Sequence, residues 1–87
     1  MINITNTNGV FRLHNDHKSF LILGGELGNS SASSREYMES VWPTLKAMNL
    51  NTLLMPVYWE IIEPEEGKFD FSLIDGLLHD ARHYHMN

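Results

Sequence analysis

Short apolar runs alternate with longer stretches of helical periodicity along most of the chain. Residues 20–23 and 52–57 form nearly continuous apolar runs, which are typical of strands buried on both faces of a parallel sheet. Apolar residues then recur at spacings of three and four over positions 38–48 and 74–81, as on the buried stripe of a helix. The pattern predicts a strand over about residues 19–24, a helix over about 34–48, a strand over about 52–57 and a helix over about 72–85.

The order strand, helix, strand, helix predicts βα units and a parallel sheet, and therefore the α/β class. Two such strands cannot cover four apolar faces, so we expect the chain to be part of a larger domain. A complete eight-fold βα barrel takes about 250 residues, whereas this chain has 87.

Polar residues mark the predicted boundaries. Residues 1–9 are rich in Asn and Thr and predict a loose lead-in. Asn15-Asp16 separates two apolar runs, which predicts a turn and with it an N-terminal β-hairpin.

The first helix carries its own start and stop signals. Ser33 followed by Glu36 fits a capping box, so the helix should begin near Ser34. Pro43 lies inside the apolar stripe and is expected to kink the helix or to open a second segment. Asn49 is predicted to end it.

Composition and charge narrow the class of partners. Hydrophobic residues make up 43% and charged residues 20%, as in ordinary globular proteins, and the net charge is -5. No basic stripe is present, so nucleic acid and anionic membrane surfaces are not expected partners. There is no cysteine, no apolar run approaches the ~20 residues of a membrane-spanning helix, and the N-terminus does not resemble a signal peptide. The cellular compartment stays open.

Two groups of residues after the predicted strands are candidates for chemistry. Glu26, in G-G-E-L-G-N-S-S, follows the first strand, where a βα barrel would place its active site. It could bind sugar hydroxyls or act as an acid or base, or it could simply cap a Gly-rich turn. Tyr58-Trp59-Glu60 follows the second strand and combines an aromatic face with a carboxylate, as in carbohydrate subsites. Alternatively, Trp59 packs in the core and Glu60 is solvated.

Two other motifs favour structural roles. In the loop over residues 63–71, Phe69 and Phe71 are expected to face the core while Asp70 faces out. His79 and His83 have the spacing of metal ligands on a helix, but they lie off the apolar stripe, so a solvated outer face is the prediction.

Much of the sequence resembles a family of carbohydrate-cleaving enzymes. The segments N-L-N-T-L (residues 49–53) and V-Y-W-E-I-I-E-P-E-E-G-K-F-D-F (residues 57–71), followed by an amphipathic helix, resemble clan A glycoside hydrolases. Within that clan, the spacing W-x-x-x-E-P-x-x-G-x-F-D-F is similar to the β-galactosidases of families 35 and 42. The resemblance extends from about Phe20 to Asn87.

The resemblance implies that residues 1–87 form the N-terminal part of a (β/α)8 TIM-barrel catalytic domain, namely its first two βα units preceded by a β-hairpin. It implies cleavage of terminal β-galactosides with retention, by two glutamates whose carboxyl groups lie about 5–5.5 Å apart. Those glutamates belong to strands four and seven, so no catalytic residue is expected in this chain, which should be inactive alone. No metal or organic cofactor is expected, because such enzymes work with carboxylates. The galactose subsite is assigned to five residues, Glu26, Asn29, Tyr58, Trp59 and Glu60.

Three positions depart from the family pattern. Family 35 enzymes have Tyr, Asn and His where this chain has Pro56, Glu60 and Ile62. The sugar contact that this Tyr makes in family 35 is therefore not expected at Pro56.

The residues and the resemblance leave three hypotheses about function open. In the first, the chain is the N-terminal piece of a β-galactosidase-like hydrolase, and its bare edges associate with the rest of the barrel or with further copies. In the second, it is a small non-catalytic carbohydrate-binding or remnant module. In the third, Glu26 and Glu60 themselves form a catalytic pair on neighbouring strands.

Overall fold

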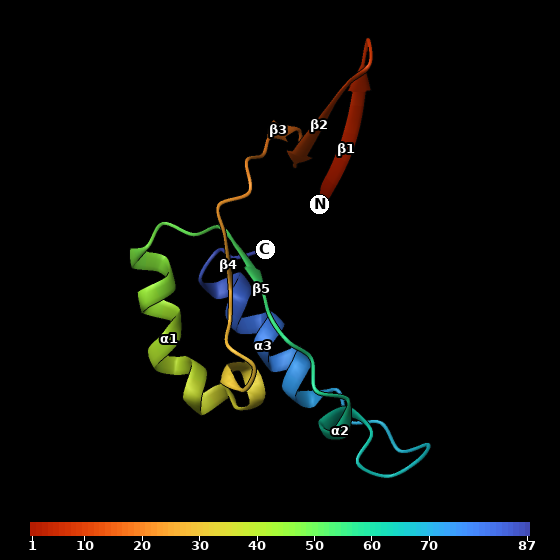
Figure 1. The fold of residues 1–87 in the computed structure, drawn as a ribbon, viewed down its shortest axis with the longest axis vertical. Coiled ribbons are helices and arrows are strands. Elements are labelled where there is room, and N and C mark those ends of the chain that lie inside the picture. Colours follow the sequence, from red (N-terminus) through yellow and green to blue (C-terminus); the bar gives the residue numbers. More distant parts are fainter.

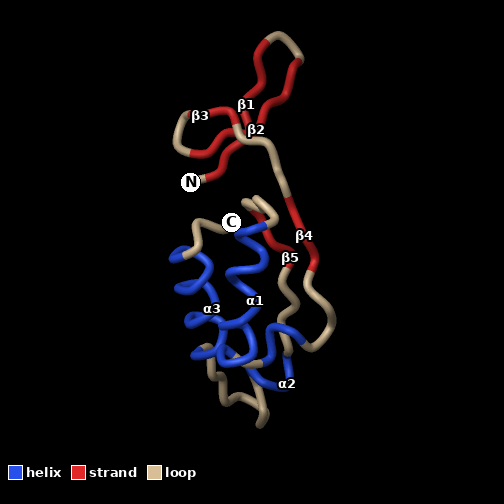
Figure 2. Tube along the Cα trace, turned by 90° about the vertical axis from the view of Figure 1, so that its left-hand side faces the viewer, coloured by secondary structure: helices blue, strands red, loops and turns tan.

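The computed structural model describes all residues from 1 to 87 and has mixed α/β structure. Two parts are visible in Figures 1 and 2: an antiparallel ribbon at the N-terminus, and a body of helices beside a short parallel sheet. In chain order the elements are β1 (Ile2–Thr7), β2 (Val10–Asn15), β3 (Lys18–Ser19), β4 (Gly24–Glu26), the 3-10 helix η1 (Ser31–Ser33), α1 (Arg35–Ala47), β5 (Thr52–Leu54), α2 (Trp59–Ile62) and α3 (Ser72–His83).

The prediction of a loose lead-in over residues 1–9 is wrong, because this segment forms β1 and the turn to β2. Asn8 and Gly9 both have positive φ, 53° and 82°, as a tight two-residue hairpin turn requires. The predicted turn near Asp16 is also present and joins β2 to the short β3. The N-terminal β-hairpin is therefore confirmed, with one more strand than the sequence analysis assigned.

The ribbon stands apart from the body. Figures 1 and 2 show it beyond the amino ends of β4 and β5, joined to β4 by an extended segment over residues 20–23. This segment is not a strand, contrary to the strand predicted over about 19–24, and Leu21 and Ile22 are exposed rather than buried. The reason is that nothing covers it, and regular pairing begins only at Gly24.

The body is built on a βαβ unit. β4 pairs in parallel with β5, with Gly25 opposite Leu53 and Glu26 opposite Leu54, and α1 connects the two strands. The second strand is shorter than the predicted 52–57, because the ladder closes with a bond from Leu27 N–H to the Leu54 carbonyl and Pro56 has no N–H to extend it.

The first helix begins one residue away from its predicted cap. Ser34, rather than Ser33, is the N-cap, and its Oγ accepts a hydrogen bond from the Tyr37 N–H at 3.3 Å. The Ser33 hydroxyl instead donates to the Ser30 carbonyl in η1. The helix runs without interruption through Pro43.

Both long helices end in the same way. Asn49 after α1 and His85 after α3 have left-handed backbone, with φ of 59° and 57°. The following residues, Leu50 and Met86, donate back to the carbonyls of Leu45 and Ala81. Each end is therefore a Schellman motif, and the prediction of a helix stop at Asn49 is confirmed.

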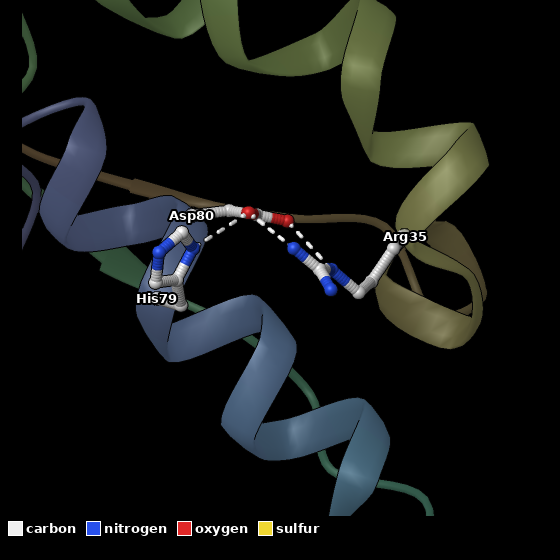
Figure 3. Close-up of polar contacts among 3 residues, drawn as sticks. All are labelled: Arg35, His79 and Asp80. Carbon is white, nitrogen blue, oxygen red and sulfur yellow. Dashed lines mark hydrogen bonds and ion pairs between the residues drawn. The ribbon is translucent and has the colours of Figure 1, made fainter.

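The core lies where α1 and α3 meet the sheet. Figure 2 shows both helices on the same side of the β4–β5 pair. Met38 and Trp42 of α1 are fully buried, and Trp42 stacks on Tyr84 with ring centroids 5.7 Å apart. On the outer side, Arg35 reaches across to Asp80 of α3 and joins the two helices (Figure 3). No helix is both long and apolar enough to cross a lipid bilayer.

Candidate functional site

The carboxyl ends of β4 and β5 lie at the same edge of the sheet, because the strands are parallel. Figure 1 shows this edge on the side of η1 and α2, away from the ribbon. Ligand sites of open and closed βα sheets form at this edge, where the loops after the strands gather.

Glu26 is the last residue of β4 and lies opposite Leu54. Side chains of paired residues point to the same face of a sheet, and this face is the one that the helices leave bare, since Leu53 and Met55 pack on the helix side. Leu54 is 65% exposed, and Glu26 is exposed as well.

The Gly24-Gly25 pair lets β4 lie close to its neighbours. A Cβ on Gly25 would come within 2.8 Å of Leu50 Cδ1, and one on Gly24 within 3.3 Å of the Ile22 side chain. Gly25 thus has a packing reason, since it lets Leu50 pack closely against the strand that ends at Glu26.

A hollow of about 230 Å³ opens at this edge. Glu26 and Asn29 supply its hydrogen-bonding side chains. The remaining lining residues are Leu27, Leu54, Met55 and Pro56. Two of the five residues assigned to a sugar site therefore lie together, in a shallow hollow that combines a carboxylate, an amide and an apolar floor.

The other three assigned residues lie outside that hollow. Tyr58 is half-buried against the core, and its hydroxyl is buried without a hydrogen-bond partner. Trp59 and Glu60 begin α2 and are exposed. Trp59 is thus not the core residue that the alternative interpretation expected.

The loop after α2 begins with Glu63, to whose carboxylate the sequence analysis gave no role. Glu63 accepts hydrogen bonds from Trp59 Nε1 at 3.1 Å and from the Gly67 N–H at 2.9 Å. The Glu-Pro step followed by Gly was the available signal, since a carboxylate beside a turn can bind its free N–H groups.

The prediction that Phe69 and Phe71 face the core is wrong. Each is about half exposed, and they stack on each other with centroids 6.1 Å apart. Trp59 meets Phe69 edge to face at 6.3 Å. The loop is tied down by this exposed aromatic group and by Glu63, not by burial. Asp70 is exposed as predicted, and its side chain accepts the Ser72 N–H at the start of α3. The Ser72 side chain and, after it, this N–H lower the pKa of the Asp70 carboxyl.

The histidines of α3 lie on its outer face. His79 Nδ1 is 3.4 Å from Asp80 Oδ1, and the His83 ring packs edge-on against Tyr84 at 5.1 Å. No group of three metal-ligating side chains comes together in the structure.

The fold and the site define an α/β protein with a polar hollow at the carboxyl edge of a parallel strand pair. The chain is similar to β-galactosidase-like glycoside hydrolases. It is 42% identical over 57 residues to human beta-galactosidase-1-like protein 2 and 46% identical over 56 residues to human beta-galactosidase-1-like protein 3. A beta-galactosidase of Xanthomonas manihotis is 33% identical over 57 residues.

These stretches cover 64–66% of this chain but only 8–9% of each relative. The resemblance noted from the motifs is thus confirmed over about two thirds of the chain. No family model matches the sequence.

Proposed function

We propose that this chain forms the first two βα units of a (β/α)8 barrel in a β-galactosidase-like glycoside hydrolase that cleaves terminal β-galactosides with retention. Similarity to the three β-galactosidase-type proteins supports the enzyme class. The βαβ unit and its polar carboxyl edge support the assignment of the sugar site to that edge.

One observation carries the barrel proposal: Asn87 pairs with β5 as a third parallel strand would. Its N–H donates to the Asn51 carbonyl at 2.8 Å, and its carbonyl accepts from the Leu53 N–H at 2.7 Å. This pair of bonds is the repeating unit of a parallel ladder, on the side of β5 opposite β4. Consecutive strands that are neighbours in space, each followed by a helix, are the order of a βα barrel.

The two βα units also end in segments of the same local geometry. Asn49-Leu50-Asn51 and His85-Met86-Asn87 each run from a left-handed helix stop, through an apolar residue that packs on the core, to an Asn. The backbone of Asn51 bonds Leu23 just before β4, and that of Asn87 bonds Asn51 and Leu53 at β5. The same local geometry at both helix-to-strand joints supports a repeated βα architecture.

The bare face of the sheet supports the same proposal. Leu54 is 65% exposed on this face, and only seven of the 87 residues are buried. In a closed barrel that face lies inside and is covered by the other strands. Association with the rest of the barrel would bury it, and so would self-association.

In this proposal the chain supplies part of the sugar site. Glu26 and Asn29 hydrogen-bond sugar hydroxyls, Trp59 stacks on the apolar face of a pyranose ring, and Tyr58 and Glu60 complete the wall. The two catalytic glutamates lie elsewhere in the barrel, as the family resemblance implies. The chain alone should therefore bind a galactoside weakly and not hydrolyse it.

Saturation-transfer NMR with methyl β-galactoside tests the proposal, because it detects weak binding. We expect signal at the sugar ring protons that is reduced in Glu26→Gln and unchanged in Glu66→Gln, a matched control from an exposed loop. Equal signal from both variants, or none from the wild type, would contradict the proposed site. Hydrolysis of an aryl galactoside by the chain, lost in Glu60→Gln, would instead support catalysis by Glu26 and Glu60.

A further inference from the structure

Trp59 is an exposed side chain that is nevertheless held from two directions. It is 61% exposed. Its indole N–H donates to Glu63, and its ring meets the edge of Phe69, which stacks on Phe71. Restricting an exposed side chain costs conformational entropy, and here the hydrogen bond to a carboxylate and the aromatic contact offset that cost.

The two oxygens of the Glu63 carboxylate accept two hydrogen bonds from different parts of this loop. Oε2 accepts from Trp59 Nε1, while Oε1 accepts from the N–H of Gly67, whose φ of 78° marks a tight turn. The nearby Lys68 is paired with Glu65 and does not compete for Glu63. Glu63 therefore ties the first turn of α2 to the turn after it.

This tie lies on the functional side of the fold. The α2 helix follows β5 at the edge where β4 presents Glu26, and the ribbon lies at the opposite end (Figure 1). A half-exposed aromatic ring at such an edge can stack on the C–H face of a sugar, and a ring that is already ordered loses less freedom on binding.

We propose that Glu63 is a positioning residue that holds Trp59 as a preorganised stacking surface for a pyranose ring. This inference rests on the proposed function, because the ring is that of the galactoside. Glu63 itself does not touch the sugar. Its effect on binding passes through the indole.

Labelling with 5-fluorotryptophan provides the test, because the chain has two tryptophans, one buried and one exposed. Trp59→Phe assigns the signals. Trp42 then reports whether each variant is folded, and the width and relaxation of the Trp59 signal report its mobility. Glu63→Ala removes both hydrogen bonds, Glu63→Gln keeps one acceptor oxygen, and Glu66→Ala is the matched control on the same loop.

We expect Glu63→Ala to increase the mobility of Trp59, to leave the Trp42 signal unchanged, and to weaken methyl β-galactoside binding by about three- to tenfold, the effect of losing one ordered side chain. Glu63→Gln should be intermediate, and Glu66→Ala should match the wild type. Unchanged mobility of Trp59, or unchanged affinity despite a mobile Trp59, would overturn the positioning role. A wild type that does not respond to the galactoside, while Glu63→Ala still loosens Trp59, would overturn the proposed function and leave Glu63 a purely structural tie.

Discussion

Arg35 and Asp80 lie 45 positions apart in the sequence, yet their side chains form a bidentate ion pair that joins the start of α1 to α3. The Arg35 Nε lies 2.9 Å from Asp80 Oδ2, and Nη2 lies 2.7 Å from Oδ1 (Figure 3). Two parallel bonds set the relative position of the helices more firmly than a single contact.

The ion pair should make stability depend on pH. The bonds from Arg35 lower the pKa of Asp80 below its usual 3.8, with a smaller contribution from His79. A group whose pKa is lowered in the folded state stabilises the fold above its ordinary pKa, and that contribution is lost as the pH falls through the lowered value. Urea unfolding of Asp80→Asn should therefore show a lower midpoint than the wild type at pH 7, with the difference shrinking below about pH 4. A difference that stays constant down to pH 2 would contradict this role.

Gly76 makes room for the arginine. A Cβ at this position would lie within 2.7 Å of Arg35 Nε and closer still to its Cδ, so Gly76→Ala should displace the side chain and disrupt the pair. When Arg35 is replaced by Ala, the same Gly76→Ala change should stabilise the helix by about 1 kcal/mol, the usual gain of Ala over Gly. The measurement is a double-mutant cycle by urea unfolding. Equal effects of Gly76→Ala in the two backgrounds would rule out the proposed contact.

Asn51 anchors the segment that joins the ribbon to the body. Its side chain accepts from the Leu23 N–H and donates to the Leu21 carbonyl, at 2.9 and 2.8 Å. The same side-chain oxygen also accepts from the Thr52 hydroxyl at 2.9 Å. Asn51→Ala should lower the free energy of unfolding by about 1.5–4.5 kcal/mol, the sum of three net hydrogen bonds. Amide hydrogen exchange should accelerate at Leu23. Asn6, whose side chain accepts only the Gly9 N–H in the ribbon, offers a matched control, since Asn6→Ala should leave Leu23 exchange unchanged.

The left-handed stop after α3 predicts opposite effects at neighbouring histidines. His85 has a φ of 57°, which is unfavourable for a side chain with a Cβ, whereas His83 is inside the helix. His85→Gly should raise the free energy of unfolding, and His83→Gly should lower it, each by about 0.5–1 kcal/mol. Thermal or urea unfolding measures both. Two destabilising substitutions would argue against the Schellman geometry at this end.

The two main helices and the α/β order were predictable, because their signals are local. The stripe of α1 and the helix stop at Asn49 follow from spacing and from the tolerance of Asn for left-handed backbone. Glu26 does lie at a strand end, but not for the predicted reason, because Gly24 and Gly25 form the strand itself and the apolar run before them is unpaired. The Asn8-Gly9 turn was an equally local signal that the sequence analysis passed over.

The sequence by itself determined the two long helices and the stop of α1 at Asn49, because these depend on the residues within a few positions. Only the tertiary structure decided the features that join distant positions: the pairing of Arg35 with Asp80, the tie of Asn51 to residues 21–23, and the strand-like pairing of Asn87 with β5. It also decided that Phe69 and Phe71 remain half exposed. Their burial depends on which surfaces face them across the fold, and no periodicity along the chain encodes that.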